Sequence, residues 1–226
     1  MSKVIGIAAH GELFTTEVSN ADRYYFGNNY NKRITECGGL PFGLLPSDAV
    51  LDERAFEHCD ALLISGGTKV WPYQFQAIHH AVTTGKKLLG ICLGMQSINL
   101  YFSSLETAEK NGTERTAAAL FETPRVDLGF VDGHYNGMLR GREEECKHAV
   151  DLVDGSLIRR LVGANWLRAV SVHKHCVATP SAHVTVAGYA EDGTIEGIEH
   201  GDNIRGVQFH PEADDKLNCL FRWLCE

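Results

Sequence analysis

The stretch KLLGICLGMQSINL, residues 87–100, decides the fold of this chain. It begins with an apolar run of strand length, and the residues after its second glycine suit a helix. Cys92 stands between Gly90 and Gly94, the spacing of a nucleophile elbow with cysteine in place of serine. A strand that turns sharply into a helix needs small residues on both sides of the nucleophile. The stretch therefore predicts a cysteine at a helix N-terminus, where the helix dipole and free N–H groups stabilise a thiolate.

Similar apolar runs precede this elbow and alternate with segments of helical character. Runs without polar alternation are typical of strands covered on both faces, and glycines or prolines bound the helical segments. This alternation predicts an α/β fold with a parallel, doubly wound sheet. The expected strands are 4–9, 40–45, 61–65 and 88–92, and the expected helices are 21–37 and 72–84.

The second half of the chain has a different pattern, with two-residue alternation and tight turns. It predicts a smaller antiparallel β element, with a hairpin turn at Glu191-Asp192-Gly193 and a closing helix over 214–225. No linker separates the halves, so a single domain over 1–226 is expected, with an insertion at about 103–145. The expected strands are 148–153, 169–173, 183–190, 194–199 and 205–209.

Composition excludes several classes of function. The chain has 226 residues, 21 Lys and Arg against 29 Asp and Glu, and a net charge of -8, which argues against binding to nucleic acid. No apolar run reaches the roughly 18–20 residues of a membrane helix, and the start lacks a signal sequence, so a cytoplasmic protein is expected. Seven cysteines without a C-x-x-C pair indicate reduced thiols rather than disulfides or a zinc ribbon.

A second motif, His210-Pro211-Glu212, lies near the end of the chain. On an extended strand the histidine and the glutamate point to the same side, so the carboxylate can orient the imidazole. The proline between them indicates that the strand ends there, at a rim where a site can open. Alone this tripeptide is typical of a turn, but together with the cysteine elbow it predicts a general base.

Other histidines and cysteines carry weaker signals. The sequence His173-Lys174-His175 has no carboxylate or cysteine at metal-ligand spacing, and neither has the pair His79-His80, so no metal site is predicted. Cys176 lies close to two histidines and is a candidate second reactive thiol, but it does not stand at a helix start. No cofactor is expected.

The order nucleophile, histidine, glutamate resembles the class I glutamine amidotransferase superfamily, in which Ser65-Gly66-Gly67 and Ser171-Val172-His173 also fall in the expected order. Within it the chain looks most like the γ-glutamyl-γ-aminobutyrate hydrolase family, the C26 peptidases, through Cys37-Gly-Gly-Leu-Pro41 and Asp192-Gly-Thr-Ile-Glu196-Gly-Ile-Glu199. The sequence of the elbow, Cys92-Leu-Gly-Met-Gln96, is more similar to that of the ammonia-producing amidotransferases. The resemblance implies a flavodoxin-like three-layer sandwich with a central, mostly parallel sheet.

The resemblance also implies a mechanism. The Cys92 thiolate attacks the δ-carbonyl of a γ-glutamyl amide, His210 passes a proton to the leaving amine, and Glu212 holds His210. Backbone N–H groups bind the oxyanion, and the resulting γ-glutamyl thioester is hydrolysed by water. The residues implied for the oxyanion and the glutamyl group are Gly66, Gly67, Leu93, Gln96, Ser171, Val172 and His173.

Three functions are compatible with these motifs. The first is a hydrolase of γ-glutamyl-γ-aminobutyrate or related γ-glutamyl amines. The second is a glutaminase subunit that supplies ammonia to a partner synthase, and the third is a non-catalytic redox-sensing or binding homologue, against which the histidine and glutamate pair argues. A small γ-glutamyl substrate is the expected partner, without nucleic acid or membrane, and a homodimer is allowed. The amine half would be selected by loops, including Phe14 to Tyr25 and the 103–145 segment.

Overall fold

The computed structural model describes residues 2–12, 23–135 and 143–226. Its central feature is a sheet of nine strands. The first five strands of the sheet pair in parallel, and each further strand pairs antiparallel with its neighbour. Their order is β4 (Leu40–Leu44), β1 (Val4–Ala8), β5 (Ala61–Ile64), β6 (Lys87–Ile91), β13 (Ile204–Val207), β12 (Ile195–His200), β11 (Thr185–Ala190), β8 (Lys147–Leu152) and β9 (Trp166–Val170).

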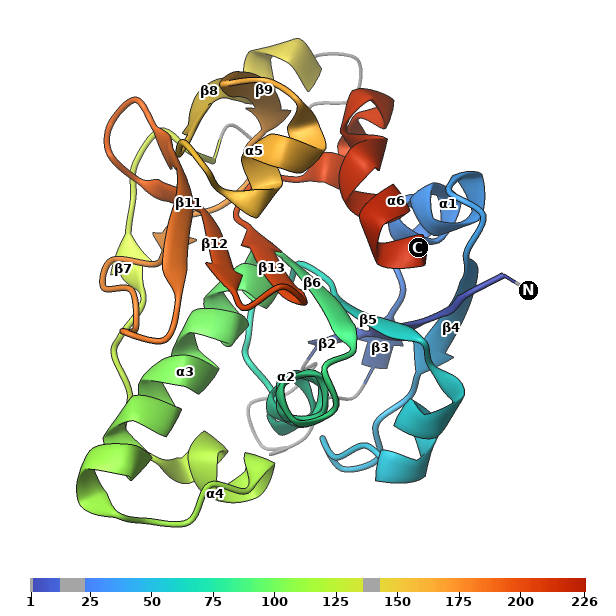
Figure 1. Cartoon of the computed structure of the whole chain (residues 1–226), viewed down its shortest axis with the longest axis vertical. Coiled ribbons are helices and arrows are strands. Elements are labelled where there is room, and N and C mark those ends of the chain that lie inside the picture. Colours follow the sequence, from blue (N-terminus) through green and yellow to red (C-terminus); the bar gives the residue numbers. More distant parts are fainter. Residues whose placement is uncertain (1, 13–22, 136–142) are drawn as a thin grey trace.

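Helices cover both faces of this sheet, so the predicted three-layer α/β fold is confirmed (Figure 1). One face carries α2 (Pro72–Thr84) and α3 (Leu93–Asn111). The other carries α1 (Asn28–Glu36), α5 (Leu157–Val162) and α6 (Asn218–Cys225). The four apolar runs of the first half form parallel strands, of which β1, β5 and β6 are largely buried between the two helical layers. Strand β4 lies at the edge of the sheet and is mostly exposed.

The smaller antiparallel β element predicted for the second half is confirmed, and most of its strands extend the central sheet. Strand β13 makes this connection, since it pairs in parallel with β6 and antiparallel with β12. The predicted Asp-Gly hairpin joins β11 to β12, where Gly193 takes a positive φ of 86°. Two small sheets pair β2 (His10–Glu12) with β3 (Arg23–Tyr25) and β7 (Gly129–Phe130) with β10 (His175–Cys176).

The helix expected over 21–37 is wrong in its first part. Residues 23–25 form β3, which pairs with β2, and α1 begins only at Asn28 after Gly27. The ring of Tyr24 packs edge-on against that of Tyr73, with centroids 6.0 Å apart, so tertiary contacts override the local helical pattern. Residues 14–22 of the expected specificity loop lie outside the described residues.

The region 103–145 is built in several parts. Its first nine residues continue α3, which ends at Asn111, and α4 (Ala117–Glu122) follows. Residues 136–142 lie outside the described residues. The closing helix is shorter than expected, because the residues at its expected start form a separate 3-10 turn, η4 (Asp215–Leu217). The other 3-10 segments are η1 (Glu53–His58), η2 (Glu143–Cys146) and η3 (Pro211–Ala213).

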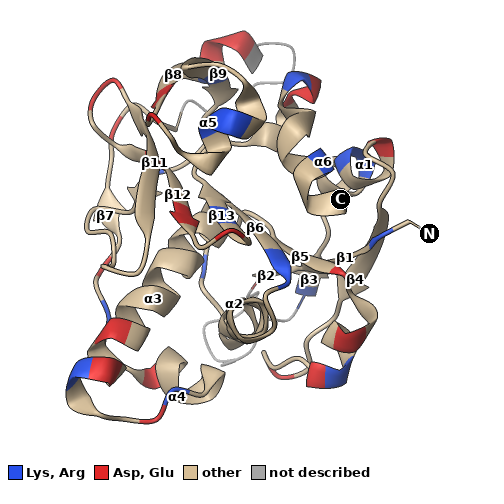
Figure 2. Ribbon diagram, in the orientation of Figure 1, with Lys and Arg blue, Asp and Glu red and all other residues tan. Residues whose placement is uncertain are grey.

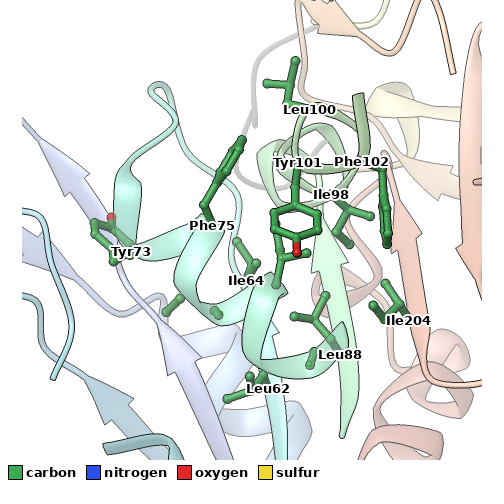
Figure 3. Close-up of a cluster of buried hydrophobic side chains, with 14 of the residues drawn as sticks. Leu62, Ile64, Tyr73, Phe75, Leu88, Ile98, Leu100, Tyr101, Phe102 and Ile204 are labelled. Atoms are coloured by element: carbon green, nitrogen blue, oxygen red, sulfur yellow. The ribbon is translucent and has the colours of Figure 1, made fainter. Parts of the chain in front are cut away.

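A large apolar cluster holds α2 and α3 against the sheet (Figure 3). Leu62 and Leu88 from the strands meet Phe75, Ile98 and Tyr101 from the helices, and all five side chains are buried. Burying a side chain of this size contributes about 1.5–3 kcal/mol, so this cluster fixes α3 and the cysteine that precedes it.

Charged residues lie mostly toward the periphery of the ribbon, and basic residues are interspersed with acidic ones (Figure 2). Among the described residues, no helix combines the length and apolar character needed to cross a membrane.

Candidate active site

Cys92 occupies a strained turn between β6 and α3. Its φ of 53° and ψ of -107° lie in a region that residues other than glycine rarely adopt. Such a conformation costs about 1–3 kcal/mol and is typical of functional sites. The Cys92 N–H donates to the carbonyl of Val207 at 2.8 Å, so the turn is anchored to the neighbouring strand β13. The elbow predicted from the sequence is therefore present.

The two flanking glycines are required by close backbone contacts. A Cβ atom on Gly90 would lie 2.6 Å from the carbonyl oxygen of Gly94. A Cβ atom on Gly94 would lie 2.3 Å from the carbonyl oxygen of Ile64. Neither backbone neighbour can move aside easily, which explains why the elbow has a glycine on each side of the nucleophile.

His210 and Glu212 form a close pair after the end of β13. Nδ1 of His210 lies 2.7 Å from Oε1 of Glu212. The strand expected over 205–209 ends at Val207, and Glu212 lies in the 3-10 turn η3, so a turn rather than an extended strand brings the two side chains together. The carbonyl of Glu212 accepts from Nε of Arg33 at 3.1 Å, which fixes this turn against α1.

The charge on His210 is set by its two neighbours. Burial lowers the pKa of His210, but the Glu212 carboxylate and the Cys92 sulfur outweigh it and hold this pKa well above its ordinary value. The imidazole is therefore protonated at neutral pH. Because Nδ1 is paired with Glu212, the interaction of His210 with the Cys92 sulfur involves Nε2, which is the nitrogen placed to exchange a proton with the substrate.

Tyr30 is a residue of this site that the sequence reasoning missed. Its hydroxyl accepts a hydrogen bond from the Gly66 N–H at 3.2 Å. Burial and the charge of Glu212 raise the pKa of Tyr30 well above its ordinary value, so the hydroxyl stays protonated. The Gly66 N–H is thus already engaged. The N–H groups of Gly67 and Leu93 are the better candidates for an oxyanion, because Leu93 opens α3, where the first N–H groups have no acceptor within the helix.

Replacing Tyr30 with phenylalanine tests this positioning. Tyr30→Phe leaves the Gly66 N–H without its acceptor, and we expect about 1–3 kcal/mol lower stability and about tenfold lower kcat. Tyr73→Phe is the matched control, since it removes another buried hydroxyl, which donates to the Ala9 carbonyl at 2.8 Å. Denaturant melts and kinetics of both variants give the comparison. Equal loss of kcat in both would assign Tyr30 a purely structural role.

A pocket of about 290 Å³ opens beside Cys92. This volume lies near the lower limit for small-molecule sites. Six of the residues predicted to bind substrate or react line it: Gly67, Cys92, Leu93, Gln96, Val172 and His173. Five further lining residues were not predicted: Thr68, Leu128, Tyr135, Lys174 and His175.

Two residues predicted to border the glutamyl group hold the pocket wall in place. Nε2 of Gln96 donates to the His175 carbonyl at 2.7 Å and to the Gln208 side chain at 3.0 Å. Oγ of Ser171 donates to the His134 carbonyl at 2.9 Å, and Ser171 does not line the pocket. Both side chains therefore position the segment that carries Val172 and His173.

The remaining candidates differ from Cys92 in their surroundings. The seven cysteines, all of them among the described residues, form no disulfide. Burial raises the pKa of the Cys176 thiol, which disfavours the reactive thiolate. His10, which the sequence did not single out, lies against Gly67, because a Cβ on Gly67 would lie 2.3 Å from its Nδ1.

Comparisons with known proteins agree with this architecture. The sequence pattern of class I glutamine amidotransferases matches residues 22–221. A CTP synthase from Treponema pallidum is 33% identical over 191 residues, which cover 76% of this chain and 32% of that protein. The chain therefore spans about a third of that relative. The HisH subunit of imidazole glycerol phosphate synthase from Prochlorococcus marinus is 24% identical over 196 residues, covering 79% of this chain and 84% of that one.

Solved structures show the same fold. The glutaminase domain of Trypanosoma brucei CTP synthase, with bound acivicin, superposes with a TM-score of 0.65 at 15% identity, covering 98% of this chain and 91% of that one. A glutamine amidotransferase from Thermotoga maritima superposes with a TM-score of 0.62 at 17% identity, covering 98% and 80%.

Proposed function

This chain belongs to the class I glutamine amidotransferase family, and we propose that it is a cysteine-dependent hydrolase of γ-glutamyl amides. The observation that carries the proposal is the strained elbow of Cys92 beside the pocket, with the 2.7 Å pair of His210 and Glu212 next to it. We further propose that residues 1–226 act as one domain, because strands from both halves of the chain share the central sheet.

The geometry supports an acyl-transfer reaction in two steps. The Cys92 sulfur attacks the δ-carbonyl carbon of the γ-glutamyl amide, and the Gly67 and Leu93 N–H groups stabilise the oxyanion. The protonated His210 gives its proton to the leaving nitrogen, so that the C–N bond breaks and a γ-glutamyl thioester remains. His210 then takes a proton from water, which attacks the thioester and releases glutamate.

The pocket supports a substrate whose leaving amine is larger than ammonia. The exposed side chains of Tyr135 and Lys174 lie at the pocket, with Nζ of Lys174 4.9 Å from the Tyr135 ring centroid. Such a pair can contact a substituent that extends outward from the scissile nitrogen. This arrangement, together with the sequence likeness to the γ-glutamyl-γ-aminobutyrate hydrolases, favours γ-glutamyl amines over glutamine itself.

A second candidate function is favoured by the comparisons. The HisH relative is named as a subunit of a synthase, and the Trypanosoma structure is named as a glutaminase domain. By analogy the chain would hydrolyse glutamine and deliver ammonia to a synthase partner.

A substrate panel separates the two candidates. The purified protein is incubated with glutamine, γ-glutamyl-γ-aminobutyrate and γ-glutamyl-p-nitroanilide, and glutamate release is measured. We expect kcat/KM at least about tenfold higher for a substituted amide than for glutamine, since uniform binding of the substituent adds about 1.4 kcal/mol or more. Preferred hydrolysis of glutamine, stimulated by a synthase, would support the glutaminase instead.

A further inference from the structure

A buried cluster of two imidazoles and one carboxylate lies at the pocket wall, and none of its three groups takes part in the proposed bond-breaking steps. Nδ1 of His134 and Nε2 of His173 are 3.2 Å apart. Oε1 of Glu196 lies 3.3 Å from each of these nitrogens. All three residues are buried, and Glu196 has no exposed surface. The three atoms therefore form a nearly equilateral triangle inside the protein.

Each ring has one inner nitrogen, which faces the cluster, and one outer nitrogen, whose hydrogen bond decides whether the inner nitrogen carries a proton. Nε2 of His134 lies 3.1 Å from Oδ2 of Asp192, and Nδ1 of His173 lies 3.1 Å from the carbonyl oxygen of His175. A carboxylate and a carbonyl only accept hydrogen bonds, so both outer nitrogens carry the proton. In neutral imidazoles the two inner nitrogens then present lone pairs toward each other and toward Glu196. Three acceptors facing one another need a positive charge between them.

The spacing of the cluster fits a metal ion better than a proton. A tetrahedral zinc ion with bonds of about 2.0–2.1 Å places its ligand atoms about 3.3–3.4 Å apart. Octahedral ligands at the same bond length would be closer, about 2.9 Å apart. A proton on one of the nitrogens would bond to only one of the other two atoms and leave the third acceptor unsatisfied. Among the described residues, neither carboxylate oxygen of Glu196 has a partner at hydrogen-bonding distance and angle.

We propose that His134, His173 and Glu196 bind one Zn²⁺ ion. Asp192 and the His175 carbonyl are the outer partners that orient the two imidazoles, an arrangement common around zinc ligands. Nε2 of His148 lies 3.5 Å from Oε2 of Glu196, so this ring is the fourth ligand or the partner of the second carboxylate oxygen. A separate cavity of about 250 Å³, lined in part by His134, His148 and Asp192, gives the ion access.

The position of this site suggests a structural role. The four side chains come from the segment before residue 136, from β8, from the segment after β9 and from β12, where acidic residues stand out in Figure 2. His173 also lines the substrate pocket. The bound ion would therefore tie β12 to the pocket wall through His173.

Metal content and spectroscopy test the proposal without any measurement of activity. We expect stoichiometric zinc in protein purified from zinc-supplemented cells, and Co²⁺ added to the chelator-treated protein should give the intense visible bands of a tetrahedral site. Glu196→Gln and His134→Ala should lose the metal, and Asp192→Ala should bind it about 10–100-fold more weakly. Chelation should lower the Tm of the unmodified chain but not that of Glu196→Gln.

Two controls make the result specific. His183→Ala removes a histidine that also lies against a glutamate, Glu109, at 2.9 Å, and it should keep the full metal content. Cys92→Ala should also keep it, which excludes the thiol as the ligand. If the unmodified chain contains no zinc and gives no cobalt bands when titrated, the cluster is held by protons and the proposal is overturned, however the variants fold.

Discussion

Replacing Cys92 with alanine is expected to lower kcat/KM for γ-glutamyl amides by about 10⁴-fold or more. The variant lacks the sulfur that forms the thioester, so only the oxyanion donors and the substrate contacts remain to accelerate attack by water. Alanine is smaller than cysteine and does not crowd the elbow. Alanine adopts the φ of 53° at the same cost as cysteine, so stability should change little. Glutamate release and a denaturant melt give the two readouts.

Cys176→Ala is the matched control for this experiment. Cys176 is also a buried free thiol, and the preceding residue, His175, lines the pocket beside Cys92. We expect its kcat/KM to stay within about threefold of the unmodified chain. Labelling with an electrophilic glutamine analogue should modify Cys92 and spare Cys176 in peptide mapping. Undiminished turnover in Cys92→Ala would overturn the proposed nucleophile and revive the non-catalytic alternative.

Replacing Glu212 with glutamine should lower kcat by about 10²–10⁴-fold and change its dependence on pH. The Glu212 charge is the largest of the effects that raise the pKa of His210, while burial opposes it. Without that charge only the Cys92 sulfur opposes burial, and the pKa of His210 falls. The reactive form needs a protonated His210, so the alkaline limb of the pH profile of kcat/KM should move to lower pH.

The same shift has a consequence for stability. Because the pKa of folded His210 is raised above its unfolded value, its contribution is fully present below about pH 6.5 and is lost as the pH rises through the folded pKa. Glu212→Gln should flatten this dependence in denaturant melts at several pH values. Glu36→Gln is a control, since this carboxylate pairs with Arg33 at 2.8 Å beside the same turn without contact to His210. An unchanged alkaline limb in Glu212→Gln would show that Glu212 does not set the charge of His210.

Much of the fold followed from local patterns in the sequence. The continuous apolar runs predicted the parallel strands, and Pro72 and Gly85 predicted both ends of α2. The structure differs most where a long-range partner decides, as at Arg23–Tyr25, which pairs with β2 instead of extending α1. A strand pair needs a second segment that local periodicity does not contain.

The candidate site shows the same division. The sequence by itself predicted the elbow at Cys92 and named His210 and Glu212 as a pair, because each depends on a few consecutive residues. The expected strand geometry of the pair was wrong, since a 3-10 turn brings the two side chains together. Only the tertiary structure placed Tyr30 against the Gly66 N–H. The sheet order also brought His134, 39 residues from His173, into contact with Glu196. His173-Lys174-His175 lacked a carboxylate at metal spacing along the chain, yet folding supplies one from β12, since buried charges find partners through space and not along the sequence.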